Sequence, residues 1–330
     1  MLRISIFILL LLSFFQGFSQ WTQTNGPRGG RILSLCAEGN SIYAGSTGGI
    51  WISAVPGASW TRTATGLPNS GIIAVMAAGS NIWVGITGSG IFKSADSCAH
   101  WTPANSGLTN FALHALAHGP AKLFAATGGG LFFSSDSGDH WDLAEGSISG
   151  KNISSLVCKG STVITGSYGE GIFRSSDNGN TWQSANSGLN DLFILSLATD
   201  SSIIAAGTEG GKVYISTDDG VTWQDSSSGL PAETPVNTLT FIENNLFAGI
   251  GGQGIFRRSS IDFSWIAVNN YLTNRIINSI VTSGNRIFAG TDGGGIFRSD
   301  DLGETWMPVN DGLVAASVKS MIVKGTVIMT

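Results

Sequence analysis

Eight tryptophans recur along this chain at nearly constant spacing. They are Trp21, Trp60, Trp101, Trp141, Trp182, Trp223, Trp265 and Trp306. The successive intervals are 39, 41, 40, 41, 41, 42 and 41 residues. A period near 40 residues indicates one small copied unit, and so small a unit buries its apolar face only by stacking on its neighbours. The spacing therefore restricts the chain to a repeat architecture.

The seventh copy shows what one unit contains. Residues 277–281 and 285–290 read as two strands joined by a Ser-Gly-Asn turn, and residues 296–299 and 305–309 supply two more. Between the second and third strands, residues 291–295 form a hairpin loop whose glycines permit positive φ. No part of the unit has the 3.6-residue period of a helix.

Four short antiparallel strands copied about every 41 residues predict an all-β fold, a β-propeller of four-stranded antiparallel blades. The competing architecture is a solenoid, but solenoid repeats are usually shorter and contain no four-strand meander. Seven units are complete. Their third strands are expected to open at Ile50, Ile91, Leu131, Ile172, Val213, Ile255 and Ile296.

The pieces left over at the two chain ends decide the expected number of blades. One strand at residues 21–23 and two at 317–322 and 326–330 would form a single unit split between the termini. Three apolar strands without partners would be exposed edges. We therefore expect seven complete units plus one split unit, which makes eight blades, with seven blades as the alternative.

The N-terminus is typical of a signal peptide. Arg3 precedes an apolar run at residues 4–15, and small residues follow at 17–19, so cleavage is expected before Gln20. The run is too short to span a bilayer. The sequence thus predicts a signal peptide at 1–19 and one propeller domain at 20–330, apparently truncated at its C-terminus, in a protein that is secreted, periplasmic or at the cell surface.

Charge and cysteine content exclude several classes of function. The net charge is −5 with 12 % charged residues, and no basic run is available to neutralise the phosphates of a nucleic acid. Three cysteines, Cys36, Cys98 and Cys158, are an odd number for an exported protein, and we expect no disulfide framework among them. We also expect no cofactor and no metal, and a monomeric chain.

A second pattern, Ser-x-Asp-x-Gly-x-Thr-Trp, lies between the third and fourth strands of the units. It is complete from Ser175, Ser216 and Ser299, whereas His100 and His140 replace the threonine in units two and three. The members that keep the aspartate and the tryptophan are Asp96, Asp136, Asp177, Asp218 and Asp301 with Trp101, Trp141, Trp182, Trp223 and Trp306.

The chemistry of this turn favours a structural role. A short carboxylate can accept backbone N–H groups two residues further on, the glycine permits a left-handed conformation, and the tryptophan buries a large apolar area. The alternative is a calcium or glycan site in every turn. Each turn offers one or two carboxylates where calcium prefers six or more oxygens, which disfavours that alternative.

These turns resemble the Asp-box (BNR) repeat shared by sialidases, xyloglucan-cleaving glycosidases, sortilin-type receptors and photosystem II assembly-factor-like propellers. The resemblance covers nearly the whole chain after the signal peptide and implies a propeller fold. It implies little about activity, because these relatives do different things. It also implies that ligands bind on the face opposite the boxes.

Enzyme sites of these relatives are poorly matched. A sialidase-like site would need an Arg-Ile-Pro motif, and the nearest segment, Arg31-Ile32-Leu33, lacks the proline. It would also need a Tyr–Glu pair from separate blades, whereas Tyr168 and Glu170 share one hairpin. A glycosidase would need two facing carboxylates, for which units four and five offer Glu170, Asp191 and Glu209.

The histidines do not form a recognisable metal site. His114 and His118 are four residues apart, which on a strand separates them by about 13 Å. Lys93, Arg174, Arg257 and Arg298 share one position after the third-strand aromatic, and either face an acidic partner or are scattered charges at the rim.

We therefore predict an exported, non-enzymatic propeller that is a binding or assembly platform for a protein or glycan partner. A carbohydrate-active hydrolase of the Asp-box kind is the alternative. The expected binding residues break the otherwise uniform Gly/Ser/Thr/Asn loops of units four to six. They are Tyr168, Glu170, Asp191, Phe193, Glu209, Lys212, Tyr271 and Arg275.

Overall fold

The computed structural model describes most of the repeat region. The described residues are 32–38, 41–46, 49–53, 59–63, 65–68, 70–78, 80–86, 88–259, 264–310, 322–324 and 327–329. The expected signal peptide and the strand at residues 21–23 lie outside them, as do most of the last two expected strands.

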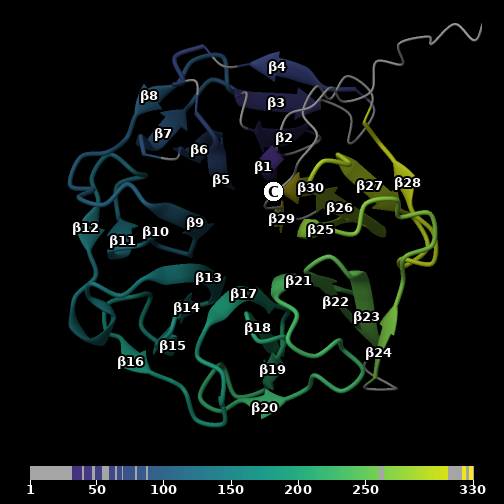
Figure 1. Cartoon of the computed structure of the whole chain (residues 1–330). Coiled ribbons are helices and arrows are strands. Elements are labelled where there is room, and N and C mark those ends of the chain that lie inside the picture. The colour runs from purple at the N-terminus through teal and green to yellow at the C-terminus, as the bar shows by residue number, and fades with distance from the viewer. Residues whose placement is uncertain are drawn as a thin grey trace, which may run out of the picture.

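The described chain forms four-stranded antiparallel sheets arranged around an axis (Figure 1). The first strand of each sheet is innermost in Figure 1. These are β1 (Ile32–Glu38), β5 (Ile72–Ala78), β9 (Leu113–His118), β13 (Ile153–Lys159), β17 (Ile194–Thr199), β21 (Val236–Ile242) and β25 (Ile277–Ser283). The second strands are β2 (Ser41–Ser46), β6 (Asn81–Ile86), β10 (Leu123–Thr127), β14 (Thr162–Ser167), β18 (Ile204–Thr208), β22 (Asn245–Ile250) and β26 (Arg286–Thr291).

The outer half of each sheet is made by its third and fourth strands. The third strands are β3 (Gly49–Ser53), β7 (Gly90–Ser94), β11 (Gly130–Ser134), β15 (Gly171–Ser175), β19 (Val213–Ser216), β23 (Gly254–Ser259) and β27 (Ile296–Ser299). The outermost are β4 (Thr61–Thr63), β8 (Thr102–Pro103), β12 (Asp142–Leu143), β16 (Gln183–Ser184), β20 (Gln224–Asp225), β24 (Trp265–Ala267) and β28 (Met307–Pro308).

The predicted all-β propeller of four-stranded antiparallel blades is confirmed. In the seventh copy, β25 to β28 lie where the sequence places them, although the fourth strand is only two residues long. The third strands begin within one residue of the expected positions. Apart from the short 3₁₀ turn η1 (Gly146–Ile148), no helix occurs among the described residues.

The predicted eight-bladed ring, with seven units and one split unit, is wrong. Six sheets, from β5 to β28, are described with their side chains nearly throughout, and β1–β4 has the same strand order. The C-terminal pieces β29 (Ile322–Lys324) and β30 (Val327–Met329) pair only with each other, as a two-stranded sheet near the axis beside β1 and β25. No strand of an eighth blade pairs with them within the described chain.

The physical reason is that only two short strands, β29 and β30, are described between the first and last sheets, where they contact both β1 and β25. Trp60 and Tyr43 of the first sheet share one apolar cluster with Phe288 and Val309 of the last. The two sheets are thus joined by apolar side chains, and the two-stranded hairpin beside them does not make a four-stranded blade.

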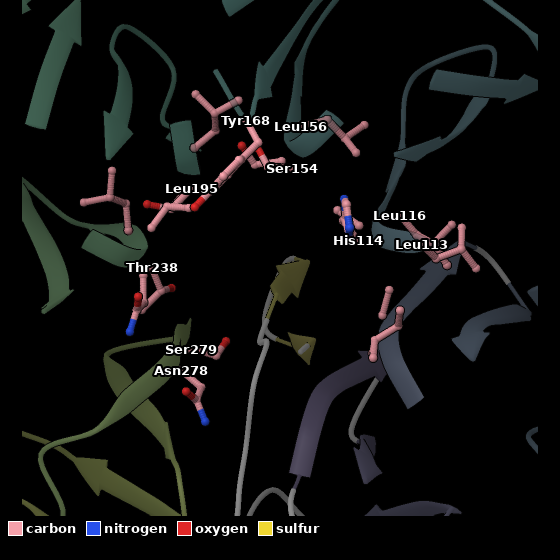
Figure 2. A pocket seen from close by; sticks show the side chains of 18 of the residues that line it. Leu113, His114, Leu116, Ser154, Leu156, Tyr168, Leu195, Thr238, Asn278 and Ser279 are labelled. Carbon is pink, nitrogen blue, oxygen red and sulfur yellow. The ribbon is translucent and has the colours of Figure 1, made fainter. Parts of the chain in front are cut away.

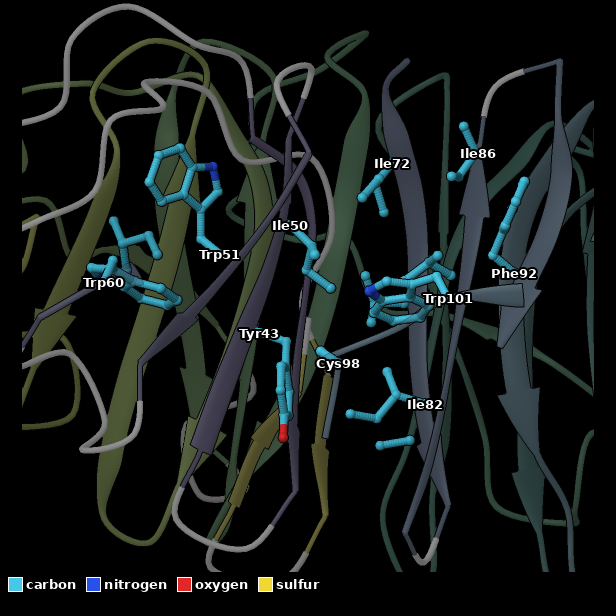
Figure 3. Packing of buried hydrophobic residues seen from close by; sticks show 14 of the residues in the cluster. Tyr43, Ile50, Trp51, Trp60, Ile72, Ile82, Ile86, Phe92, Cys98 and Trp101 are labelled. Carbon is cyan, nitrogen blue, oxygen red and sulfur yellow. The ribbon is translucent and has the colours of Figure 1, made fainter. Parts of the chain in front are cut away.

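Apolar side chains between neighbouring sheets make up the core. Six apolar clusters are present among the described residues, and most join two neighbouring sheets. In Figure 3, Trp60 and Trp101 lie on opposite sides of the first sheet, with Ile50 and Tyr43 between them. Both faces of a blade are therefore buried, as expected for sheets that stack around an axis.

No helix in the described part of the chain is long and apolar enough to cross a membrane.

Candidate functional site

The repeated Ser-x-Asp turns are closed by a fixed set of hydrogen bonds. In the turn that starts at Ser175, the Ser175 hydroxyl donates to Asp177 Oδ1 at 2.7 Å and accepts the Gly179 N–H at 2.8 Å. Thr181 donates its N–H to Asp177 Oδ1 at 2.9 Å and its hydroxyl to Oδ2 at 2.6 Å. The carboxylate thus binds a residue four positions on, rather than two as expected.

The other turns repeat this geometry with small changes. Asp218 and Asp301 bind their threonines in the same way, and Asp96 and Asp136 bind the N–H groups of His100 and His140. Hydrogen bonds to the ionised form stabilise it. Those from Thr222 lower the pKa of Asp218 to about 2, and those from His100 lower the pKa of Asp96 to about 2.

In four of the units, the tryptophan of the repeat links two blades. Its indole N–H donates to a carbonyl in the loop after the preceding sheet's last strand. The pairs are Trp141 with Ala104 at 2.9 Å, Trp223 with Ala185 at 2.9 Å, Trp265 with Ser226 at 2.7 Å and Trp306 with Val268 at 2.8 Å. The indole nitrogens of Trp60, Trp101 and Trp182 have no hydrogen-bond partner among the described residues, and Trp182 is only partly buried.

The basic residues that share one third-strand position also link blades. Lys93 pairs with Asp139 at 2.9 Å, and Arg174 donates to the Asp219 carbonyl at 2.7 Å. Arg257 donates to the Leu302 carbonyl at 2.7 Å and pairs with Glu304 at 2.8 Å. Each acceptor lies in the turn of the following blade, so these three cations are bound within the propeller. Arg298, in the last sheet, pairs with Asp300 of its own sheet at 2.8 Å.

The opposite face is formed by the hairpins between second and third strands and by the loops that lead to the next sheet. A recurring asparagine, whose role was not identified from the sequence, fixes the hairpin in four of the blades. Asn186 accepts the Ile172 N–H at 2.7 Å and donates to the Glu170 carbonyl at 3.0 Å. Asn105, Asn269 and Asn310 do the same in their own blades. The sequence signal was present, because each asparagine lies 14 residues after the N–H it accepts.

Three of the predicted binding residues meet on this face. The Tyr168 hydroxyl, from the β14–β15 hairpin, donates to both carboxylate oxygens of Glu209 in the β18–β19 hairpin, at 2.6 Å each. The rings of Tyr168 and Phe193 meet edge to face, with centroids 5.1 Å apart and planes at 81°. Both aromatic side chains are 43 % exposed. We call Tyr168, Phe193 and Glu209 the aromatic corner.

Another of the predicted residues, Asp191, supports the aromatic corner. Asp191 accepts the Phe193 N–H and the Gly210 N–H, at 3.1 Å each, and so ties the loop before β17 to the hairpin that carries Glu209. Glu170 pairs with Lys151 at 2.6 Å. The hydrogen bond to Glu209 raises the pKa of the Tyr168 phenol, because losing the proton would break that bond and place two negative charges together.

The remaining three predicted residues are not joined to the aromatic corner by any contact described. Lys212 pairs with Asp225 at 2.9 Å beside a separate cavity of about 550 Å³. Tyr271 lies in the β24–β25 loop, 76 % exposed, and has a φ of +63° where sister units have glycine. The Arg275 carbonyl accepts the Gly254 N–H at 3.1 Å.

A cavity of about 590 Å³ lies at the axis next to the aromatic corner. Residues of six first strands line it, and Tyr168 lies at its edge (Figure 2). His114 lines it as well. The cavity is therefore continuous with the surface on which the predicted binding residues meet.

Several polar side chains of this cavity hold neighbouring blades together. Each is the extra residue of a β-bulge in a first strand, and each donates to a carbonyl of the next first strand. The pairs are His114 Nδ1 with Ile153 at 2.8 Å, Ser154 Oγ with Ile194 at 2.5 Å and Asn237 Nδ2 with Ile277 at 3.0 Å. Because a carbonyl only accepts, Nδ1 of His114 carries a proton.

Comparisons with known proteins support the fold. No protein-family profile matches the chain, and no curated protein sequence matches it. Among solved structures, the computationally designed Ika8 protein matches with a TM-score of 0.64 and 16 % identity over 92 % of this chain and 98 % of that chain. YCF48 from Cyanidioschyzon merolae matches with a TM-score of 0.60 and 15 % identity over 80 % and 94 %.

Two further likenesses are to longer chains. The extracellular domain of BT4673 from B. thetaiotaomicron has a TM-score of 0.68 and 19 % identity over 84 % of this chain but 40 % of that one. An ancestral GH74 enzyme has a TM-score of 0.60 and 16 % identity over 86 % and 55 %. At such identities these likenesses establish the fold alone, which enzymes share with other proteins.

Proposed function

We propose that this protein is a non-enzymatic binding platform whose partner, a protein or glycan, docks on the face that carries the aromatic corner. The observation behind the proposal is the meeting of Tyr168, Phe193 and Glu209 from two blades at the edge of the axial cavity. Half-exposed aromatic side chains that are held rigidly are typical of interaction sites.

The two faces of the ring differ in how far their side chains are already bound within the molecule, and this difference also supports the proposal. The turns of the Ser-x-Asp type, which we take to be Asp-box turns with a structural role, bind side chains of the preceding blade. Asp219, for example, binds two side chains of the preceding blade, since its carboxylate pairs with Lys159 and its backbone carbonyl accepts from Arg174. The face with the hairpins leaves its aromatic residues exposed instead.

We further propose that residues 20–330 act as one exported, monomeric domain released from a signal peptide at residues 1–19. The extracellular domain of BT4673 is a neighbour in fold that is consistent with export. The remaining predicted residues, Lys212, Tyr271 and Arg275, would then lie outside the centre of the contact.

Site-specific photo-crosslinking in the organism that carries the gene tests this proposal. A benzophenone amino acid replaces Phe193 in one variant and Met307 in the control, since Met307 is similarly exposed, at 45 %, but lies on the outermost strand β28. We expect a discrete adduct at position 193 and none at 307. No adduct at 193, or equal adducts at both positions, would contradict the proposal.

The alternative, a carbohydrate-active hydrolase, makes a different prediction. It requires turnover of aryl glycosides that falls on changing Glu170, Asp191 or Glu209 to the amide. Two of these carboxylates have structural partners here, since Glu170 pairs with Lys151 and Asp191 holds two N–H groups. We expect no turnover from the purified protein. Turnover by the wild type that is lost in these variants would show that the protein is a hydrolase and not a non-enzymatic platform.

A further inference from the structure

Several exposed carboxylates on this protein pair with a lysine or arginine, whereas Glu209 does not within the described chain. Glu170, Asp219, Asp225 and Glu304 each lie within 2.6 to 2.9 Å of a Lys or Arg nitrogen. Glu209 has the Tyr168 hydroxyl as its side-chain partner, and no cation pairs with it among the described residues. Its negative charge is therefore available at the surface.

The aromatic rings beside Glu209 add a second attraction for a cation. The face of an aromatic ring carries negative electrostatic potential, and a cation within about 6 Å of the centroid is attracted to it. The Tyr168 phenol donates to a carboxylate, which polarises the ring further. Phe193 stands nearly perpendicular to it, so two rings and one carboxylate border the same corner.

Neighbouring groups leave the local charge negative. Asp191, which orders the loop before Phe193, accepts two backbone N–H groups and likewise has no cation partner in the described chain. The nearest described cation along the hairpin, Lys212, is already paired with Asp225. Among the described residues, no lysine or arginine forms an ion pair with Glu209 or Asp191.

We propose that the aromatic corner binds a cationic side chain, arginine or lysine, of a protein partner. The cation lies over the exposed rings of Tyr168 and Phe193 and pairs with Glu209. This inference rests on the proposed function, since it assigns the chemistry of the partner to the same surface. It also selects a protein with basic side chains over a neutral glycan.

The test uses two small probes that differ only in charge. N-acetyl-arginine amide and its uncharged isostere N-acetyl-citrulline amide are titrated into ¹⁵N-labelled protein at low salt, where surface attractions are least screened. The amide signals of Glu209 and Gly210 report on the corner. We expect the arginine probe to bind about fivefold more tightly than the citrulline probe or better, from the combined contributions of an exposed ring and an exposed ion pair.

Two variants test whether the preference for the arginine probe depends on the negative charge of Glu209. In Glu209→Gln the preference for arginine should fall to within twofold, whereas Glu304→Gln, which removes a carboxylate paired with Arg257 on the face of the turns, should keep it. The rest of the spectrum shows whether each variant is folded. Equal shifts from both probes, or none from either, would overturn the inference. Neither result would contradict the platform, which the cross-linking at position 193 tests independently.

Discussion

At the scale of single residues, the box aspartates are defined by the bonds they accept. Asp177, Asp218 and Asp301 each bind one N–H and one hydroxyl of a threonine four residues on. This pairing holds the turn in one conformation, and it depends on the carboxyl group remaining ionised.

Acid should therefore weaken the fold through these groups. A carboxyl whose pKa is lowered by folding stabilises the folded state fully above its unfolded pKa of 3.8 and loses that contribution as pH falls through the folded value, about 2 for Asp218 and Asp96. The urea midpoint of unfolding should therefore decrease as the pH is lowered from 5 to 2. In Asp218→Asn this decrease with pH should be smaller. The same pH dependence in wild type and variant would contradict the stabilising role of the ionised Asp218.

A glycine in the loop after β16 tests how closely the blades approach. A Cβ at Gly188, where φ is +93°, would lie 1.9 Å from the Trp223 carbonyl of the next blade. At Gly146, where φ is +83°, a Cβ would meet nothing within 4 Å. Both alanine variants bear the cost of a left-handed backbone, about 1 kcal/mol.

Gly188→Ala should cost at least about 2 kcal/mol more than Gly146→Ala, because the clash is with backbone that cannot move aside. Chemical denaturation of the two variants measures the difference. Equal stabilities would show that the loop is not packed against the tryptophan backbone.

At the scale of elements, the copied unit explains why the strands could be predicted from the sequence and why the contacts between blades could not. Strands β25 to β27 follow from alternation within residues 277–299, and the hairpin glycines mark where they turn. Tyr168 and Glu209 were recognised as candidates because they break a uniform loop pattern. That the two would meet through a hydrogen bond depends on the spacing of adjacent blades, which one unit does not encode.

Other features at this scale were missed for the same reason. The bulge residues His114, Ser154 and Asn237 look unrelated in sequence, yet each donates to the following blade. Tyr271 breaks the pattern as clearly as Tyr168 does, but no described contact joins it to the aromatic corner. Breaking a repeat thus identifies candidates without showing which of them meet.

Asn186 offers a test of how the hairpins support the site. Asn186→Ala leaves the buried Ile172 N–H without its acceptor and should cost about 1 to 3 kcal/mol, as should Asn105→Ala in the second blade. Only Asn186→Ala should also loosen the hairpin of Tyr168, seen as faster amide exchange at Gly169 and Glu170. Equal exchange in the two variants would contradict this role.

At the scale of the whole molecule, closure of the ring was predicted correctly in kind but wrongly in number. The surplus strands suggested an eighth blade, because counting copies cannot reveal that the described C-terminal strands pair only with each other. Trp60 and Phe288 belong to the apolar cluster that the first and last sheets share, and both are almost fully buried. The terminal hairpin β29–β30 then pairs by itself near the axis.

If the ring is closed, a substitution that destabilises the packing between the first and last sheets should also affect distant sheets. Trp60→Ala removes a buried indole between the first and last sheets and should cost about 3 to 5 kcal/mol. Amide exchange should then accelerate in distant sheets such as β13–β16, as it should for Trp141→Ala at an internal seam. If Trp60→Ala accelerates exchange only in the first sheet, the blades form an open stack.

The central claim is that the two faces of the ring have different tasks, and affinity for the cross-linked partner measures this directly. The partner recovered through position 193 is purified and titrated against wild type, the double variant Tyr168→Ala, Phe193→Ala, and the opposite-face variant Lys122→Ala. Lys122 binds Asn180 at 2.7 Å on the face of the turns. The account predicts at least about tenfold weaker binding for the double variant, as expected for losing two aromatic contacts, and wild-type binding for Lys122→Ala. Weaker binding for Lys122→Ala alone would place the interaction on the other face and contradict it.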